Sequence, residues 1–403
     1  MQGKVLDITA ETRRLNGVVR PALVICAILA VIGFGGSLLL ARATENGMDH
    51  LLETYLVTFA FFLSISLGGL FFVLLEHCTR AGWSVVARRV AEAVAANVWV
   101  MAILVIPVVL GMDHLYHWTD AAAVAHDPLL AGKTGFLNPT FFMIRLAIYF
   151  LIWGALATFL HRTSVAQDAS GDPALTLRME RVSAPGMVLF ALSLNFAAFD
   201  LLMSLDPHWF STIFGVYYFA ASVVAFFAVM PKIIYGLQMR GILKNAITVE
   251  HYHDFGKLLF AFVVFWAYIG FSQYMLIWYA NVPEETEWFL KRQTGEWTTV
   301  SLLLIFGHFV LPFLLLVSRF IKRRPLLLAI TGGFVAAMCW VDMYWLVIPE
   351  FSPGVARFGL LDILCFLGMN GVWSAAVVWR LSRHSAIAEK DPRLEESLVF
   401  ESA

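Results

Sequence analysis

Carboxylates and histidines inside long apolar stretches are the residues of this chain whose types and spacing could do chemistry. An ionisable side chain within a membrane-spanning helix is costly and usually faces the interior of the helix bundle. One group of such residues, near the ends of two stretches, contains Glu76, His77, Asp254 and Lys257. Histidines and carboxylates exchange protons near neutral pH, so the group suits a proton entry. It equally suits interfacial ion pairs, because Asp254 and Lys257 share one helix face.

A second group lies toward the opposite ends of the stretches and is rich in carboxylates. Asp200 lies on a stripe of small and polar residues at helical spacing. Close helix packing explains the small residues of this stripe but not its carboxylate. Asp200 and Asp342 therefore each need a neighbouring cation, such as Arg145 or a histidine, or a bound proton that keeps them neutral. The members of the group are Asp200, Asp206, His208, Gln273, Asp342 and Asp362.

Between these two groups, near mid-membrane, lie Asn195, Tyr268 and His308. Tyr268 shares a helix face with Lys257, across a gap of about two turns that only water or a neighbouring helix can bridge. A lone histidine in an apolar helix is usually a buried hydrogen-bonding group, and no second histidine at matching depth indicates a haem pair. The polar groups fit a water-assisted proton path, and they fit ordinary interhelical hydrogen bonding equally well.

Ten apolar stretches must position these side chains. A helix needs about 20 apolar residues to cross the hydrocarbon core, and each stretch meets or approaches that length. Composition agrees, because 60% of residues are hydrophobic and only 14% are charged. The sequence therefore predicts an all-α polytopic membrane protein with ten transmembrane helices, over residues 19–41, 52–75, 92–112, 139–160, 183–205, 210–235, 256–280, 298–318, 326–347 and 358–380.

The distribution of basic residues predicts the orientation. Most of the 28 Lys and Arg fall in alternate connections, and such residues mark the cytoplasmic side. Both termini are therefore expected in the cytoplasm, with residues 1–18 as a polar leading segment and 383–403 as a polar, mobile tail. We expect a longer cytoplasmic loop over 163–181 and external loops over 114–139 and 281–297.

Other classes of function lack support in the sequence. With a net charge of −1 and no basic patch outside the short loops, nucleic acid is not an expected partner. The four cysteines form no CxxC or CxxCH motif, so no iron–sulfur, zinc or covalently attached haem site is expected in this chain. The lipid bilayer is the one partner that the composition itself requires.

Three segments together resemble one protein family. They are SLGGLFFVLLEHCTRAGW (66–83), FDLLMSLDPHWFSTIFGVYYF (199–219) and HDFGKLLFAFVVFWAYIGFSQYMLIWYANVPEETEW (253–288). They are similar to the F-type polytopic subunit, or quinone-binding subunit 2, of bacterial alternative complex III. That complex is a quinol:electron-acceptor (cytochrome c) oxidoreductase, and its subunit belongs to the NrfD/polysulfide-reductase membrane-anchor family. The similarity covers most of residues 50–350.

The resemblance implies two four-helix bundles, over 52–205 and 210–347, with the helices at 19–41 and 358–380 at the periphery. It implies a bacterial inner-membrane location and no haem or cluster in this subunit. The redox centres would lie in partners, a multihaem c-type cytochrome and an iron–sulfur protein, beside a sister NrfD-like polytopic subunit. A terminal oxidase could take the electrons onward, and a quinone, menaquinone or ubiquinone, is the small molecule that the resemblance implies.

The resemblance also selects residues. Family motifs cover His77, Asp200, Asp206, His208, Asp254, Tyr268 and the stretch from Trp278 to Glu284, whereas Asp342 and Asp362 are selected by depth alone. The candidates for quinone binding are Asp200, Asp206, His208, Gln273, Tyr274 and Trp278. The candidates for a proton path are Glu76, His77, Asp254, Lys257, Tyr268, Asn195, His308, Asp200, Asp342 and Asp362.

Three hypotheses of function follow. In the first, the chain is a membrane subunit of a respiratory quinol-oxidising complex that binds quinol or conducts protons through polar half-paths. In the second, it is a structural anchor of that complex, and its polar groups serve packing. In the third, it is an independent secondary transporter, against which stands the lack of an evident inverted repeat or of a span broken at mid-membrane.

Overall fold

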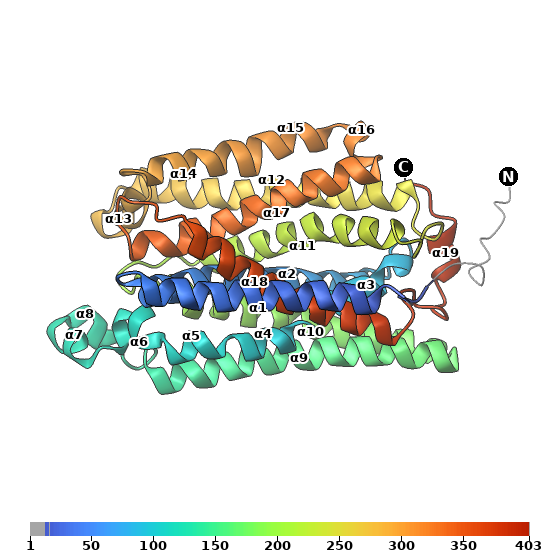
Figure 1. The fold of residues 1–403 in the computed structure, drawn as a ribbon, viewed down its shortest axis with the longest axis horizontal. Helices are drawn as coiled ribbons and strands as arrows, with labels where there is room; N and C mark the ends of the chain where they lie inside the picture. Colours follow the sequence, from blue (N-terminus) through green and yellow to red (C-terminus); the bar gives the residue numbers. More distant parts are fainter. Residues whose placement is uncertain (1–12, 16, 403) are drawn as a thin grey trace.

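The computed structural model describes residues 13–15 and 17–402. Over these residues the chain is helical without any strand, and ten spans are long and apolar enough to cross a membrane. The predicted all-α polytopic membrane protein is therefore confirmed (Figure 1). The spans are α1 (Val19–Ala43), α2 (Gly47–Thr79), α3 to α5 (Val85–Ala95, Val98–Leu104, Ile106–Leu110), α9 (Pro139–Ser170), α10 (Pro173–Leu201), α11 (Phe214–Gln238), α12 (Val249–Ala280), α14 to α15 (Trp297–Leu303, η4 at Leu304–Val310, Leu311–Val317), α17 (Pro325–Val347) and α18 (Leu360–Arg383).

Short helices connect the spans. They are α6 (Met112–Leu115), η2 (His117–Thr119), α7 (Ala121–His126), α8 (Pro128–Lys133), η3 (Met203–Leu205), α13 (Pro283–Lys291), α16 (Arg319–Lys322), η5 (Ile348–Glu350) and α19 (Leu394–Leu398). The start of α1 and the end of the chain lie at the same end of the molecule, called here the terminal end. The opposite end, which carries α7, α8 and α13, is called the distal end (Figure 1).

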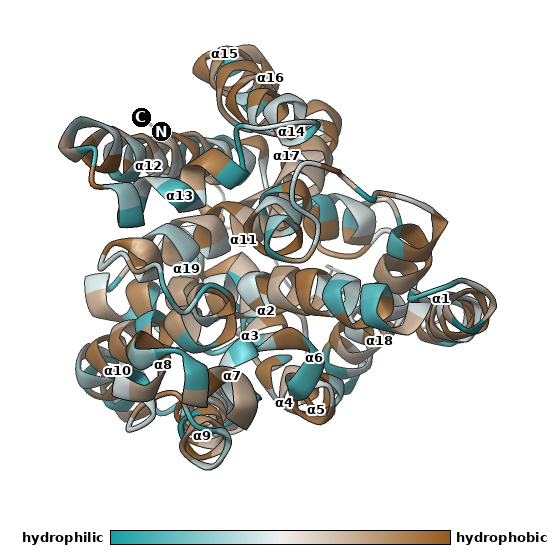
Figure 2. Cartoon of the chain, turned by 90° about the vertical axis from the view of Figure 1, so that its left-hand side faces the viewer, coloured by the Kyte–Doolittle hydropathy of each residue, from teal (hydrophilic) through white to brown (hydrophobic). Residues whose placement is uncertain are grey.

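Helix α2 is the centre of the molecule. A helix that is apolar on all sides must be buried on all sides. In the most apolar 18-residue segment of α2, 94% of the residues are buried. It contacts α3, α10, α11, α17 and α18 (Figure 2). Phe59 and Phe72 on this helix are fully buried, so the core of the protein runs along α2 rather than between two separate halves.

On either side of the contact between α2 and α11 lies a set of four spans, in which each helix contacts the next and the last contacts the first. In one set α2, α3, α9 and α10 contact one another in turn, and in the other α11, α12, α15 and α17 do the same. Helices α1 and α18 pair along the flank (Figure 2). A Cβ on Gly33 of α1 would collide with the backbone of Gly368 of α18, so the two helices can meet this closely only with glycine there.

Several boundaries differ from the sequence-based prediction. The third span starts at Val85 rather than at residue 92, because the charges of Arg89 and Glu92 pair inside the protein. The predicted loop over 163–181 is wrong: α9 runs to Ser170 and α10 starts at Pro173. The turn between them is tight because Gly171 adopts a positive φ of 69° and Asp172 caps α10.

The prediction of a mobile tail is also wrong for the part of 383–403 that the structure describes. Residues 384–402 fold back across the terminal end, where Ala386, Ile387 and Ala388 are buried. The leading segment 1–18 lies largely outside the described residues. Of its described part, Leu15 is buried and Arg13 pairs with Glu389 of the tail at 3.0 Å.

Candidate functional site

Asp342 is the centre of the most unusual polar cluster within the spans. It is fully buried on α17, where the Tyr217 hydroxyl of α11 donates to Oδ1 at 2.5 Å. The Trp266 indole of α12 donates to Oδ2 at 3.0 Å. No cation pairs with this carboxylate among the described residues. A buried carboxylate that only neutral donors stabilise is a natural place to bind and release a proton.

His308 lies against the same cluster. Its ring packs on the Trp266 ring with centroids 4.0 Å apart, and its Nε2 lies 3.5 Å from the Cys339 sulfur. Its Nδ1 is buried and has no hydrogen-bond partner among the described residues. The surrounding η4 is a π-helical segment, which fits the absence of an N–H on Pro312 to bond the His308 carbonyl. Such segments are frequent at functional sites.

A cavity of about 990 Å³ adjoins the cluster, between α12 and the α14–α15 span. Its walls are mostly aromatic and aliphatic, and its size is that of a ligand pocket. Tyr217 and Trp266 line it as well as bonding Asp342, so one layer of side chains separates the carboxylate from the cavity. Gln273, Tyr274 and Ser301 add polar groups to its walls.

An ion network closes the distal side of this cavity. Trp288 of α13 lines the cavity, stacks on Trp209 at 4.4 Å and lies under the Arg292 guanidinium. Glu350 accepts from Arg292 and from Lys291, each at 3.0 Å.

Asp206 joins the same network, 2.9 Å from Lys291. Burial alone would lower the pKa of Lys291, but the Glu350 and Asp206 carboxylates outweigh burial and raise that pKa. Burial lowers the pKa of Arg292 to about 10, so both cations remain charged at neutral pH. Asp206 is therefore part of an ion network beside the cavity rather than of its lining.

Asp200 is held in a different way, within the other set of spans. The Arg145 guanidinium donates to both of its carboxylate oxygens, at 2.9 and 2.7 Å, and the Tyr149 hydroxyl donates at 2.8 Å. The sequence-based requirement for a cation such as Arg145 is confirmed. Such a bidentate pair fixes α9 to α10.

The remaining quinone-binding candidates separate into two groups. Gln273 and Tyr274 line the cavity. Trp278 is 64% exposed and does not line it. His208 lies 2.5 Å from Asp127 at the distal surface, and this hydrogen bond lowers the pKa of Asp127.

The mid-membrane candidates also lie apart. Tyr268 lines the cavity and is 64% exposed, at its open side. The Asn195 amide donates to the Ala191 carbonyl of its own helix, so it bridges no other helix through this bond. Tyr217 and Trp266 were missed by sequence reasoning, because aromatics make up 14% of the chain and no spacing singles these two out.

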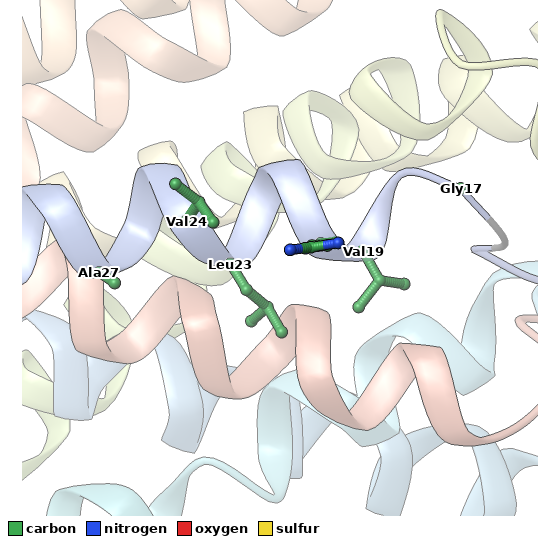
Figure 3. Close-up of a pocket in the computed structure, with 6 residues that line it drawn as sticks. Gly17, Val19, Leu23, Val24 and Ala27 are labelled. Atoms are coloured by element: carbon green, nitrogen blue, oxygen red, sulfur yellow. The ribbon is translucent and has the colours of Figure 1, made fainter.

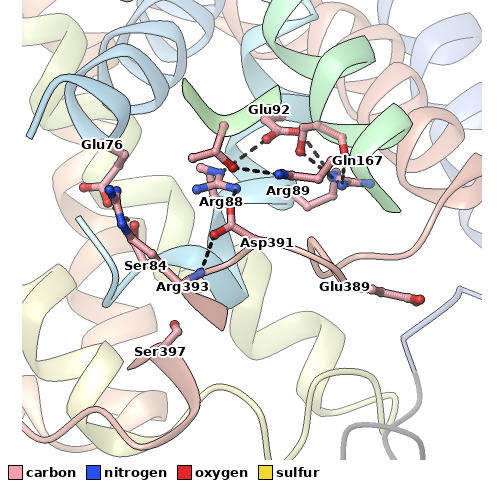
Figure 4. A network of polar contacts seen from close by, with 12 residues as sticks. Glu76, Ser84, Arg88, Arg89, Glu92, Gln167, Glu389, Asp391, Arg393 and Ser397 are labelled. Atoms are coloured by element: carbon pink, nitrogen blue, oxygen red, sulfur yellow. Dashed lines mark hydrogen bonds and ion pairs between the residues drawn. The ribbon is translucent and has the colours of Figure 1, made fainter. Parts of the chain in front are cut away.

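At the terminal end, Glu76 belongs to a network shown in Figure 4, and His77 follows it in the chain. Glu76 accepts from the Ser84 hydroxyl, and His77 is buried with its Nε2 unpaired. Arg88 pairs with Asp391 of the folded tail, and Glu92 lies 3.1 Å from Arg89.

Sequence reasoning missed these contacts, although the Arg-Arg-x-x-Glu spacing at residues 88–92 predicts a paired helix face. Asp254 and Lys257 form a separate pair, 2.6 Å apart, which the Ser402 hydroxyl covers. Asp362 lies at the distal end, outside both networks.

Figure 3 shows a groove of about 500 Å³ beside the first turns of α1. Among the described residues that line it, Arg20 is the single titratable one, and the rest are glycine or aliphatic. None of these described residues could exchange a proton near neutral pH or hold a redox centre.

No protein-family model and no curated protein matches this chain. Within the described residues, no group of three or more His, Cys, Asp or Glu side chains could hold a metal ion. The chemistry of the site must therefore be argued from its geometry.

Proposed function

We propose that the chain is an integral-membrane subunit of a respiratory quinol-oxidising complex, and that it binds quinol in the cavity beside Asp342. The observation that carries the proposal is that Tyr217 and Trp266 both line the cavity and hydrogen-bond Asp342. Quinol oxidation needs an apolar, aromatic cleft for the ring and tail and groups that take protons. In this chain a single layer of side chains, Tyr217 and Trp266, separates the apolar cleft from the proton acceptor Asp342.

The shape of the cavity suits an amphiphile that arrives from the bilayer. Tyr268, Phe271 and Ile305 line its open side and are exposed, in the middle of the spans. An isoprenoid tail can lie among such side chains while the headgroup reaches inward to Gln273, Tyr217 and Trp266. Menaquinone and ubiquinone share these features, and both fit the proposal.

Protons leave the headgroup toward buried acceptors in this proposal. Asp342 takes a proton through Tyr217, and the unpaired Nδ1 of His308 is a second buried acceptor. We propose the ion network of Asp206, Lys291 and Glu350, on the distal side of the cavity, as the exit for these protons. Electrons pass to redox centres of partner subunits, for which an iron–sulfur protein, a multihaem c-type cytochrome and a sister polytopic subunit are proposed.

Replacing Asp342 by asparagine in the assembled complex tests the proposal. Asp342→Asn keeps the size and shape of the side chain but removes the proton acceptor, so quinol-dependent turnover should fall strongly while the complex stays assembled. Asp113→Asn, at an exposed position, is the matched control. Unchanged turnover in an assembled Asp342→Asn complex would contradict the proposed role.

A structural anchor is the second candidate function. The paired networks of Arg145 with Asp200 and of Arg292 with Glu350 favour it, because each fixes neighbouring elements without leaving an acceptor free. An anchor predicts that Asp342→Asn changes the yield of assembled complex and leaves the turnover of each assembled complex unchanged. The same experiment therefore separates the two functions.

A further inference from the structure

A second polar cluster lies at the distal ends of α2, α17 and α18, away from the Asp342 site. Tyr344 of this cluster is two residues after Asp342, about 200° further around α17, so the two side chains face opposite ways. On α2, His50, Glu53 and Thr54 share one face by their spacing of three and four. The cluster is therefore separated from the quinol cavity by the body of α17.

Glu53 is the unusual member. It is 6% exposed, and its Oε2 is fully shielded and lacks a hydrogen-bond partner. Among the buried carboxylates in the described part of the chain, Glu53 alone forms neither a hydrogen bond nor an ion pair. Leaving a buried carboxylate ionised beside a second ionised carboxylate is strongly unfavourable, so this group requires a proton while Asp362 is ionised.

Asp362 faces Glu53 from the first turn of α18. It is fully buried and accepts from the Thr54 hydroxyl and the Gly359 backbone N–H, each at 2.9 Å. The two carboxylates repel each other, and each is close enough to interact with His50 and with the other. Asp362 has the hydrogen bonds that an ionised carboxylate needs, whereas Glu53 has none.

Two further groups complete the cluster. The buried Tyr344 hydroxyl interacts with both Asp362 and Glu53. Arg357, which is exposed, is the fixed cation nearby and interacts with Glu53 and His50. One fixed positive charge offsets one of the two carboxylates, and the other is neutral only with a proton bound.

His50 connects this buried pair to the surface. Its side chain is 19% exposed and its Nε2 lies 3.6 Å from the Asp362 carboxylate. Its neighbour Asp49 is half exposed and pairs with His114 of the distal surface at 3.1 Å. A histidine between a buried acid and water is suited to pass protons near neutral pH.

We propose that Glu53 and Asp362 share one exchangeable proton, which reaches them from the distal surface through His50. The site binds a proton carried by water and needs no redox centre. It goes beyond the proposed quinol function and stands independently of it. The two carboxylates act as one unit, so the proton belongs to the pair rather than to either residue.

Infrared difference spectroscopy of the full-length protein in lipid vesicles tests this proposal. A protonated carboxylic acid has a carbonyl stretching band that shifts on exchange into D₂O. Glu53→Gln should lose this band relative to the wild-type protein. Asp362→Asn should lose it too, because Glu53 can then ionise beside Arg357 as the single carboxylate of the cluster. Glu45→Gln, at an exposed position near the same end, should leave the band unchanged.

Each outcome decides the proposal. Persistence of the full band in Glu53→Gln would show that Glu53 holds no proton, and persistence in Asp362→Asn would show that the proton is not shared. His50→Gln should keep the band and slow its D₂O shift, whereas an unchanged rate would refute the route through His50. Thermal unfolding of each variant identifies any that fail to fold, and Asn at residue 362 still accepts from the Gly359 N–H. None of these measurements depends on quinol turnover, so they test this proposal separately from the proposed quinol function.

Discussion

Asp342 and Asp200 are both fully buried carboxylates, but their surroundings give them different roles. Asp200 has a bidentate arginine and a tyrosine, whereas Asp342 has one tyrosine and one tryptophan. The first arrangement stabilises a fixed negative charge. The second provides two neutral donors and suits a group that changes its protonation state. The two residues looked equivalent in sequence because both lie at the same depth of their stretches.

Removing the Tyr217 hydroxyl should affect both stability and turnover. Tyr217→Phe takes one donor from a buried carboxylate, which should cost about 2 kcal/mol in the free energy of unfolding, and quinol-dependent turnover should fall with it. Tyr218→Phe is the control, because the neighbouring hydroxyl donates to the Ala60 carbonyl and not to a carboxylate. Thermal unfolding and turnover of the two variants check this. Equal turnover in both would contradict a role of Tyr217 in proton transfer.

Breaking the Arg145–Asp200 pair should act on stability instead. Asp200→Asn leaves a buried guanidinium without its charge partner, which should cost about 3–5 kcal/mol in the free energy of unfolding. Chemical denaturation in detergent measures this loss. The double variant Arg145→Met/Asp200→Leu should recover much of it, because no unpaired charge is left behind. A single variant as stable as the wild-type protein would show that the pair is not a structural clamp.

At the scale of elements, the sequence predicted the number and positions of the spans. It did not predict the residues at which several of them begin and end. Twenty or more apolar residues leave no alternative to a spanning helix, so every predicted stretch is a helix. The third span extends to Val85 because Arg89 finds Glu92 one turn away, which a count of apolar residues cannot register. The π-helical turn around His308 fits the missing N–H of Pro312, a local effect that a count of apolar residues cannot register. The cavity was unpredictable because its walls combine side chains of α11, α12, α13, α17 and the α14–α15 span, which only the packing of the helices brings together.

The contact between α1 and α18 provides a test at this scale. Gly33→Ala would place a methyl group against the backbone of Gly368, so it should destabilise the pair by about 1–3 kcal/mol. Gly35→Ala, two residues away, meets open space and should be neutral or slightly stabilising. Thermal unfolding of the two variants compares them directly. Similar unfolding temperatures would show that the close crossing does not determine packing of α1.

The whole molecule is closed at its terminal end by its own C-terminal segment. Asp391 pairs with Arg88, Ser397 donates to the Trp83 carbonyl, and Ser402 donates to Asp254 of the other set of spans. The segment thus spans the ends of both sets. The composition of the sequence could not reveal this. The polar residues of the segment pair with buried charges, such as Arg88, that the sequence places outside the predicted spans.

Acid should release this segment. Burial alone would raise the pKa of Asp391, but the Arg88 guanidinium and its hydrogen bond outweigh burial and lower that pKa. A carboxylate with a lowered pKa stabilises the folded state above its ordinary pKa of about 4, and that stabilisation is lost as the pH falls below it. Limited proteolysis at acid and neutral pH should therefore show faster cleavage of the tail in acid.

Asp391→Asn should make the tail sensitive to protease already at neutral pH. Glu395→Gln, at an exposed position of the same segment, should behave like the wild-type protein. Equal protection of Asp391→Asn and the wild-type protein at neutral pH would show that the Arg88 pair does not hold the segment.

Photo-crosslinking of an azidoquinone to the assembled protein, with mass-spectrometric mapping of the labelled peptides, tests the central claim most directly. The quinol site proposed beside Asp342 predicts labels on α12 and the α14–α15 span, around Tyr268, Phe271 and Leu302, that excess unlabelled quinone suppresses. Suppressible labels confined to α9 and α10 around Asp200, or no suppressible label on this chain, would contradict it.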